Sequence, residues 1–287
     1  MILITGATGL IGTRLVRHLV AAGEKVRAVT RDPATSTLPE GVEAVSGDPS
    51  RPTTIAAAFD GVRSVFLNPR AVGTAAPELL ALASEHGVRT AVALAATNVD
   101  DDPSRQPSRY RGDYNREVEA AVIESGLDWV SLRPSMFATN TIGLWAAAIR
   151  AGDVVRMPYP DAAWAPLAED DLAEVAAIAL RTDRLLGRKV ELTGPESLTQ
   201  AEMVGVIAAA LDRPMRVEQV TPESVESTML GAGFSGGFVR ALLRLQAEYA
   251  TRPAPVSDEV TGILGRPART FAAWVADNVA AFAGESR

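Results

Sequence analysis

The N-terminal segment MILITGATGLIGTRLVRHLVAAGEKVRAVTRD places three glycines between an apolar strand and an amphipathic helix. Residues 1–5 form the predicted strand, and Gly6, Gly9 and Gly12 follow it at intervals of three. Glycine permits a tight turn and a close approach of the backbone to a ligand. The unpaired N–H groups that open a helix attract phosphate. This strand–turn–helix unit therefore predicts a pyrophosphate-binding site of the βαβ type.

The residues around the glycines favour a nucleotide over a purely structural turn. Ile11, Leu15 and Leu19 give the following helix one apolar face, and Gly23 ends it. The spacing is GxxGxxG and not the GxGxxG of ordinary dinucleotide folds. The alternative interpretation is a turn and a helix cap that bind nothing.

The end of the second predicted strand, 26–30, indicates which nicotinamide cofactor fits. An acidic side chain there suits the ribose 2′-hydroxyl of NAD, whereas a cation suits the 2′-phosphate of NADP. Arg31 follows the strand and is able to hold a phosphate with two hydrogen bonds. We therefore expect NADP(H) in preference to NAD(H). The alternative is that Arg31 is a solvated loop residue and that Asp32 caps the next turn.

Strands alternate with helices along the rest of the chain. This order predicts an α/β fold, a Rossmann-type doubly wound parallel sheet with a smaller C-terminal substrate lobe. We expect an NAD(P)-binding domain over 1–134 and a mainly substrate-binding lobe over 135–287, with the late strand 189–193 returning to the sheet. The further predicted strands span residues 42–45, 62–67, 90–95, 129–132 and 189–192.

Composition excludes several classes of site. The chain of 287 residues has no cysteine, which rules out disulfides and thiolate chemistry. Its two histidines are far apart in sequence, so we expect no metal site. A net charge of −7 without a basic stripe argues against nucleic acid. No apolar run reaches the roughly 20 residues that span a bilayer. We expect a cytoplasmic monomer or homodimer that acts on a small molecule.

Several segments together resemble one known family. GATGLIG, the arginine after the second strand, SGLDWVSLRPSMF and VELTGPESLTQAEM resemble the NmrA-like family of atypical short-chain dehydrogenases/reductases. The resemblance covers nearly the whole chain and is nearest to the NADPH:quinone oxidoreductase-like and azoreductase-like members.

The resemblance implies a role for individual positions of this chain. The diphosphate would be held at Thr8, Gly9, Leu10 and Ile11, and the 2′-phosphate at Arg31. Ligands of such sheets sit beyond the carboxyl ends of the strands. The remaining implied or strand-exit positions are Asp48 and Pro49 beside the adenine, Asn68 and Pro69 near the nicotinamide ribose, Ala95, Ala96 and Pro134 at strand exits, and Phe137 and Asn140 at the substrate pocket.

The chain departs from the family at the expected proton donor. Ordinary short-chain dehydrogenases use Tyr-x-x-x-Lys, in which lysine lowers the tyrosine pKa. Here Tyr110 is followed four residues later by Tyr114, and the family's frequent lysine or histidine is replaced by Asn115. We expect any catalytic assistance to come from Tyr110, Tyr114 or Asn115.

The segment GAGFSGGF, residues 231–238, separates two predicted helices. Its four glycines are typical of a flexible lid that would carry Phe234 over the substrate. The alternative is a surface loop anchored by its two aromatic residues.

These features predict an NADP(H)-binding oxidoreductase. A conjugated acceptor, quinone-like or azo-like, fits the absence of a Tyr-x-x-x-Lys pair, because reduction gives an anion spread over a π-system. Two alternatives remain open: a non-catalytic regulator that senses NADP(H), and an isomerase or cyclase on the same fold.

Overall fold

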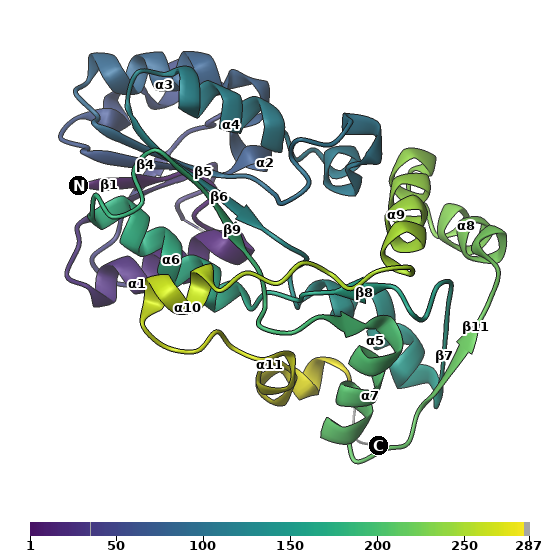
Figure 1. Cartoon of the computed structure of the whole chain (residues 1–287). Coiled ribbons are helices and arrows are strands. Elements are labelled where there is room, and N and C mark those ends of the chain that lie inside the picture. The colour runs from purple at the N-terminus through teal and green to yellow at the C-terminus, as the bar shows by residue number, and fades with distance from the viewer. Residues whose placement is uncertain (35, 284–287) are drawn as a thin grey trace. The chain divides into compact units, whose positions relative to one another are not determined.

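A seven-stranded sheet organises the first part of the structure, a computed structural model that describes residues 1–34 and 36–283. Every strand pair in it is parallel, with the order β3-β2-β1-β4-β5-β6-β9 (Figure 1). The predicted doubly wound sheet is thus confirmed. The strands are β1 (Ile2–Ile4), β2 (Val26–Thr30), β3 (Glu43–Ser46), β4 (Ser64–Leu67), β5 (Thr90–Leu94), β6 (Asp128–Pro134) and β9 (Arg188–Leu192).

Helices cover both faces of this sheet (Figure 1). One face carries α1 (Leu10–Ala21) and α6 (Glu169–Arg181), and the other carries α3 (Ala76–Glu85) and α4 (Asn115–Glu124). The short α2 (Pro69–Val72) follows β4. The central strands β1, β4 and β5 are buried on both faces, so their residues, apart from Ser64 and Thr90 at the first positions, are apolar instead of alternating.

Contacts between Cα atoms divide the chain into two compact units. The first holds residues 1–100, 112–134 and 169–192, and the second holds 101–111, 135–168 and 193–287. The late strand β9 pairs with β6 in the first unit. The predicted domain boundary at residue 134 stays a prediction, from which these units differ in the segments 101–111 and 169–192.

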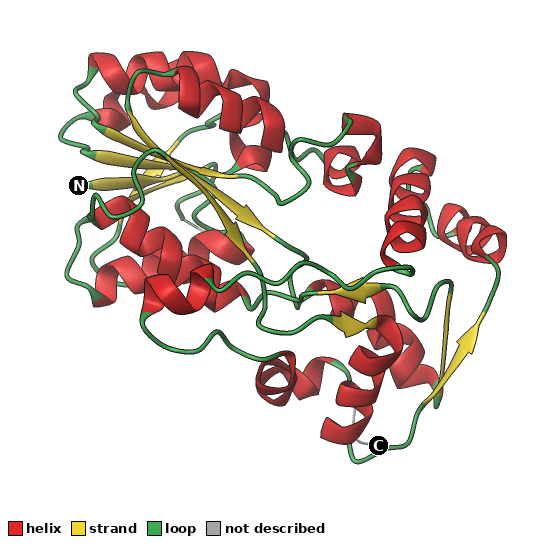
Figure 2. Cartoon of the chain, in the orientation of Figure 1, coloured by secondary structure: helices red, strands yellow, loops and turns green. Residues whose placement is uncertain are grey.

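The second unit has its own aromatic core and two small sheets, drawn in yellow in Figure 2. Strand β8 (Ala163–Trp164) pairs with β10 (Leu198–Thr199), and β7 (Val154–Met157) pairs with β11 (Arg216–Gln219). Trp145 is buried in its core. The helices are α5 (Asn140–Ala151), α7 (Gln200–Ala210), α8 (Pro222–Gly231), α9 (Gly236–Tyr249), α10 (Glu259–Leu264) and α11 (Phe271–Asn278).

The glycine-rich segment 231–238 forms much less of a loop than its composition suggests. Gly231 still belongs to α8, and α9 already begins at Gly236. The Ser235 side chain accepts a hydrogen bond from the backbone N–H of Phe238 at 3.3 Å. This cap stabilises a helix start that contains two glycines, and only residues 232–235 connect the helices. No helix in the described residues is long and apolar enough to cross a membrane.

Thr5 joins the ends of the two central strands. It is fully buried, and its hydroxyl donates to the carbonyl oxygen of Phe66 at 2.9 Å and accepts from the N–H of Asn68 at 2.8 Å. The backbone N–H of Thr5 donates to the same carbonyl. This pair of side-chain hydrogen bonds fixes the turn after β1 against the turn after β4.

Replacing this hydroxyl tests its contribution. We expect Thr5→Val to lower the free energy of unfolding by about 1–3 kcal/mol, because the N–H of Asn68 loses its partner and the carbonyl of Phe66 keeps only the backbone N–H of Thr5. Chemical denaturation measures the change. Thr182→Val is the matched control, since that hydroxyl bonds only to nearby Ile178 and Arg184, and we expect less than about 0.5 kcal/mol. Equal losses in both variants would contradict this role of Thr5.

Candidate cofactor-binding site

The turn after β1 has a backbone that only glycine accommodates at two positions. Gly6 has a φ of +66°, and a Cβ there would lie 2.9 Å from the Cβ of Asn68. A Cβ on Gly12 would lie 2.1 Å from the carbonyl oxygen of Gly6. The N–H of Gly9 donates to that same oxygen at 3.0 Å. The first turn of α1 therefore packs directly on the loop that precedes it.

The amino end of α1 is open to a ligand. Gly9 caps the helix without a side-chain hydrogen bond, and its first turn contains no acidic residue. Thr8 and Gly9 are exposed, and Leu10 keeps 41% of its surface exposed. The N–H groups of Leu10, Ile11 and Gly12 have no partner further back in the helix, so they and the helix dipole favour an anion. The predicted diphosphate residues Thr8, Gly9, Leu10 and Ile11 thus lie together at this helix start, and their contact with a diphosphate stays a prediction.

Arg31 and Asp32 follow β2, the strand next to β1, at the same carboxyl edge as the glycine turn. Both are exposed. The Asp32 carboxylate accepts a hydrogen bond from the N–H of Ala34 at 3.1 Å, so it caps its own turn. Arg31 makes no hydrogen bond or ion pair with any residue in the described ranges 1–34 and 36–283. Its guanidinium is therefore available to an anion.

The turn after β3 is held together by Asp48. Its carboxylate accepts hydrogen bonds from the N–H and hydroxyl of Ser50, at 3.0 and 2.7 Å, and lies 3.3 Å from the guanidinium of Arg51. The hydrogen bond from the Ser50 hydroxyl, helped by Arg51, lowers the pKa of Asp48. Pro49 is buried beside it. Asp48 shapes this turn with its side chain, and its predicted place beside an adenine stays a prediction.

The turn after β4 contains Asn68 and Pro69. The side-chain oxygen of Asn68 accepts from the N–H of Arg70 at 3.1 Å and caps α2, whose first residue is the buried Pro69. The Asn68 side chain packs on Gly6. The Asn68 side chain therefore packs against the glycine turn and supports it. Its position at a strand exit did not by itself reveal this role.

At the exits of β5 and β6 the backbone pairing continues past the strands. The N–H of Ala95 donates to the carbonyl of Leu132 at 2.8 Å, and that of Thr97 donates to Pro134 at 3.0 Å. Ala95 and Pro134 are buried, and Ala96 is partly exposed. These small side chains bring no polar group to this edge of the sheet.

Tyr114 and Asn115 open α4. Tyr114 occupies the cap position without capping the helix through its side chain, and Asn115 is only 4% exposed. Asn115 and Glu119 are four residues apart and share one buried face of the helix. A catalytic role for either Tyr114 or Asn115 remains a prediction.

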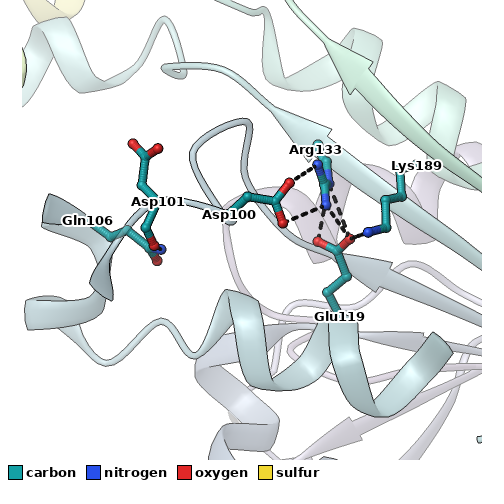
Figure 3. A network of polar contacts seen from close by, with 6 residues as sticks. All are labelled: Asp100, Asp101, Gln106, Glu119, Arg133 and Lys189. Carbon is teal, nitrogen blue, oxygen red and sulfur yellow. Dashed lines mark hydrogen bonds and ion pairs between the residues drawn. The ribbon is translucent and has the colours of Figure 1, made fainter. Parts of the chain in front are cut away.

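Behind this helix face lies a network of charged side chains (Figure 3). Arg133 of β6 donates to Glu119 of α4, with 2.7 Å as the shortest distance, and to Asp100 at 2.8 Å. Lys189 of β9 places its Nζ 3.6 Å from Glu119. Arg133 and Glu119 are 7% and 5% exposed, whereas the Asp100 side chain is 76% exposed.

The network compensates a buried charge and fixes α4 to the sheet. Burial alone would lower the pKa of Arg133, but its hydrogen bonds to Glu119 and Asp100 raise it above the ordinary value. Sequence reasoning missed this network. The available signal was a single charged residue, Arg133, in the buried part of β6, since a buried arginine requires an acidic partner.

The other predicted site residues belong to the second unit. The ring of Tyr110 packs on Gly237 of α9, where a Cβ would lie 2.2 Å from the ring, and its hydroxyl donates to Ser104 at 3.4 Å. Phe137 forms a β-bridge with Leu167. The last two are Asn140, exposed at the start of α5, and Phe234, 40% exposed and stacked on Phe238 at 5.7 Å.

The parallel sheet and the glycine cradle at its carboxyl edge define a dinucleotide-binding Rossmann protein. The chain belongs to the NAD(P)H-binding family, whose sequence model matches residues 6–182. The NmrA-like resemblance and the binding of NAD(P)H are thereby confirmed. In the described residues no three or more His, Cys, Asp or Glu side chains group as metal ligands.

Three similar proteins extend this assignment. The chain is 34% identical over 288 residues to (4-alkanoyl-5-oxo-2,5-dihydrofuran-3-yl)methyl phosphate reductase of Streptomyces griseus, covering 99% of this chain and 100% of that protein. It is 33% identical to NAD(P)H azoreductase of Xenophilus azovorans, covering 98% and 99%. The NADPH-dependent quinone oxidoreductase of Escherichia coli, solved with NADPH, shares the fold with a TM-score of 0.80 at 20% identity, covering 98% and 99%.

These relatives are named reductases and match over the full length of the chain. They confirm the predicted class, an NAD(P)H-dependent oxidoreductase of the atypical short-chain dehydrogenase type. The preferred cofactor, the acceptor and the individual site residues are not decided by this similarity.

The buried network predicts a large effect of one substitution. Glu119→Ala leaves Arg133 with Asp100 alone, so we expect the free energy of unfolding to fall by about 3 kcal/mol in chemical denaturation. Glu218→Ala, which removes an exposed ion pair with Arg156, is the control and should cost less than about 1 kcal/mol. A loss no greater than that of the control would show that the network contributes little stability.

Proposed function

We propose that the chain reduces a small conjugated acceptor, quinone-like or azo-like, with hydride from NADPH and without a Tyr-x-x-x-Lys pair. The observation that carries the proposal is the open glycine cradle after β1 with the unpaired Arg31 at the end of the neighbouring strand. The azoreductase and quinone oxidoreductase among the similar proteins support the acceptor class.

The preference for NADPH over NADH rests on two adjacent residues. Arg31 has no acidic partner among the described residues, so its donors are available to a 2′-phosphate. Asp32, the residue that would suit a 2′-hydroxyl, already accepts the N–H of Ala34. At the end of β2 the guanidinium of Arg31 is therefore available to a phosphate, whereas the carboxylate of Asp32 already accepts a hydrogen bond.

The protein's own contribution is binding and orientation. When bound, the nicotinamide supplies the hydride. Residues 6–12 would hold the diphosphate through backbone N–H groups, and the small Ala95 and Ala96 would leave room at the strand exits. Asn115 would hydrogen-bond the ribose or the acceptor but has no proton to transfer at neutral pH. A conjugated acceptor fits such a site, because the anion formed is delocalised and depends less on a general acid.

The substrate side is assigned to Phe137, Asn140 and Phe234, with Tyr110 or Tyr114 as possible hydrogen-bond donors. Their side chains offer aromatic surface and a few polar groups, the usual composition of a small-molecule pocket. Tyr110 is the weakest of these candidates, since its hydroxyl already contacts Ser104 and its ring packs on α9.

Arg31→Ala tests the cofactor preference by titration calorimetry. We expect the NADPH dissociation constant to rise by about 10- to 100-fold, because a charge-assisted contact with the 2′-phosphate is lost, and the NADH constant to stay within about twofold. Arg89→Ala, an exposed arginine at the opposite edge of the sheet, should leave both unchanged. Equal weakening of both cofactors by Arg31→Ala would contradict the preference for NADPH.

Turnover tests the reaction itself. We expect NADPH to be consumed in a one-to-one ratio with a reduced quinone or azo acceptor, followed by absorbance and by the mass of the product. Tight NADPH binding without reduction of any quinone or azo acceptor tested would instead favour a non-catalytic regulator that senses NADP(H). A product of unchanged mass would favour an isomerase or cyclase.

A further inference from the structure

The second unit contains a small pocket between helix α9 and the segment 103–111. It has a volume of about 140 Å³ and is lined by Ser104, Tyr110, Gly237, Arg240, Ala241 and Arg244. Drug-sized ligands occupy pockets of roughly 300–1,000 Å³. This pocket therefore has room for one small polar group and not for a dinucleotide.

Two of the lining side chains are arginines on one face of the same helix. Arg240 and Arg244 are four residues apart on α9 and come together in the pocket lining. The guanidinium of Arg240 folds back over the start of the helix, where a Cβ on Gly236 would lie 2.9 Å from its Nη1. Two cations thus share one lining in a chain whose net charge is −7.

Little negative charge compensates these arginines. Arg244 makes no ion pair or hydrogen bond within the described part of the chain, and Arg240 is 3.8 Å from Glu226 with 67% of its side chain exposed. None of the six lining residues carries a carboxylate, and Asp102, two residues before Ser104, accepts the N–H and hydroxyl of Ser104 at 2.8 and 2.6 Å. Arg105, by contrast, is paired with Glu248 and lies outside the lining.

The first turn of α9 adds to the positive potential. Gly237 lines the pocket at the amino end of this 14-residue helix, where backbone N–H groups and the helix dipole attract anions. Arg111, next to Tyr110 in the chain, lies 5.1 Å above the ring of Phe238 and has no acidic partner among the described residues. Two guanidinium groups and a helix start therefore line one cavity, and Arg111 lies outside that lining.

We propose that this pocket binds a phosphate-type oxyanion group. Arg244 and Arg240 hold the oxygens with charge-assisted hydrogen bonds, and Tyr110, whose hydroxyl donates to Ser104, forms part of the pocket wall. The group belongs either to the acceptor molecule or to free phosphate. The site lies in the second unit, and its binding of phosphate does not depend on the proposed function, whereas assignment of the oxyanion to the acceptor rests on that function.

Titration of the full chain with inorganic phosphate in a phosphate-free, low-salt buffer tests the site. We expect Arg244→Gln to weaken phosphate binding about tenfold, because a charge-assisted contact is lost. Arg244→Lys keeps the charge but loses the planar guanidinium. We expect its affinity for phosphate to lie between those of the unchanged chain and Arg244→Gln. Arg216→Gln removes an equal charge from an exposed position on β11 and should change nothing.

The glycine cradle of the first unit also offers phosphate a place. Phosphate binding at the pocket is therefore identified as the part of the phosphate binding that is lost in Arg244→Gln and kept in Arg31→Ala. This comparison does not require that NADPH binds. An identical phosphate dissociation constant in Arg244→Gln and Arg216→Gln, with both variants folded by thermal unfolding, would overturn the proposal.

Acceptors with and without a phosphate ester then distinguish the two sources. If the acceptor supplies the oxyanion, Arg244→Gln raises KM for the phosphorylated acceptor alone, and inorganic phosphate competes with it. If the occupant is free phosphate, KM for both acceptors stays unchanged while phosphate binding is still lost. Either pattern supports the site and names its occupant.

Discussion

The close approach of α1 to the loop before it is the constraint on which the rest of the site depends. The carbonyl oxygen of Gly6 accepts the N–H of Gly9, and Gly12 lies so close to it that no side chain fits between them. This contact aims the amino end of the helix outward from the end of β1. The hydroxyl of Thr5 and the side chain of Asn68 then tie the same turn to β4. A backbone arrangement, supported by two polar side chains, thus prepares the binding of an anion.

The parts of the fold that depend on local pattern could be predicted from the sequence. The glycine spacing, the apolar strands and the helix periodicity led to the parallel sheet, because the central strands are buried on both faces and the helices that cover them on one. The predicted ends of helices and strands were less accurate. The strand predicted over 62–67 begins only at Ser64, and half of the glycine-rich segment 231–238 lies within two helices.

What the sequence could not show is which distant side chains meet. Arg133, Glu119 and Lys189 come from two strands and a helix, and only the register of β6 and β9 brings them together. Asn68 was predicted as a ligand-side residue, yet its position against Gly6 follows from the neighbouring places of β1 and β4 in the sheet. Ser104 and Tyr110 likewise meet the arginines of α9 through the packing of segment 103–111 on that helix, which no spacing in the chain reveals.

The exposure of Arg31 has a consequence for the medium in which the protein works. Mobile ions screen an exposed charge over about 8–10 Å at ordinary ionic strength, whereas a buried pair such as Arg133 and Glu119 is largely shielded from them. The contribution of the Arg133–Glu119 pair to stability should therefore change little with salt. The proposed preference for NADPH through Arg31, in contrast, should weaken as the salt concentration rises, so that cofactor choice would become a property of the surrounding electrolyte as well as of the chain.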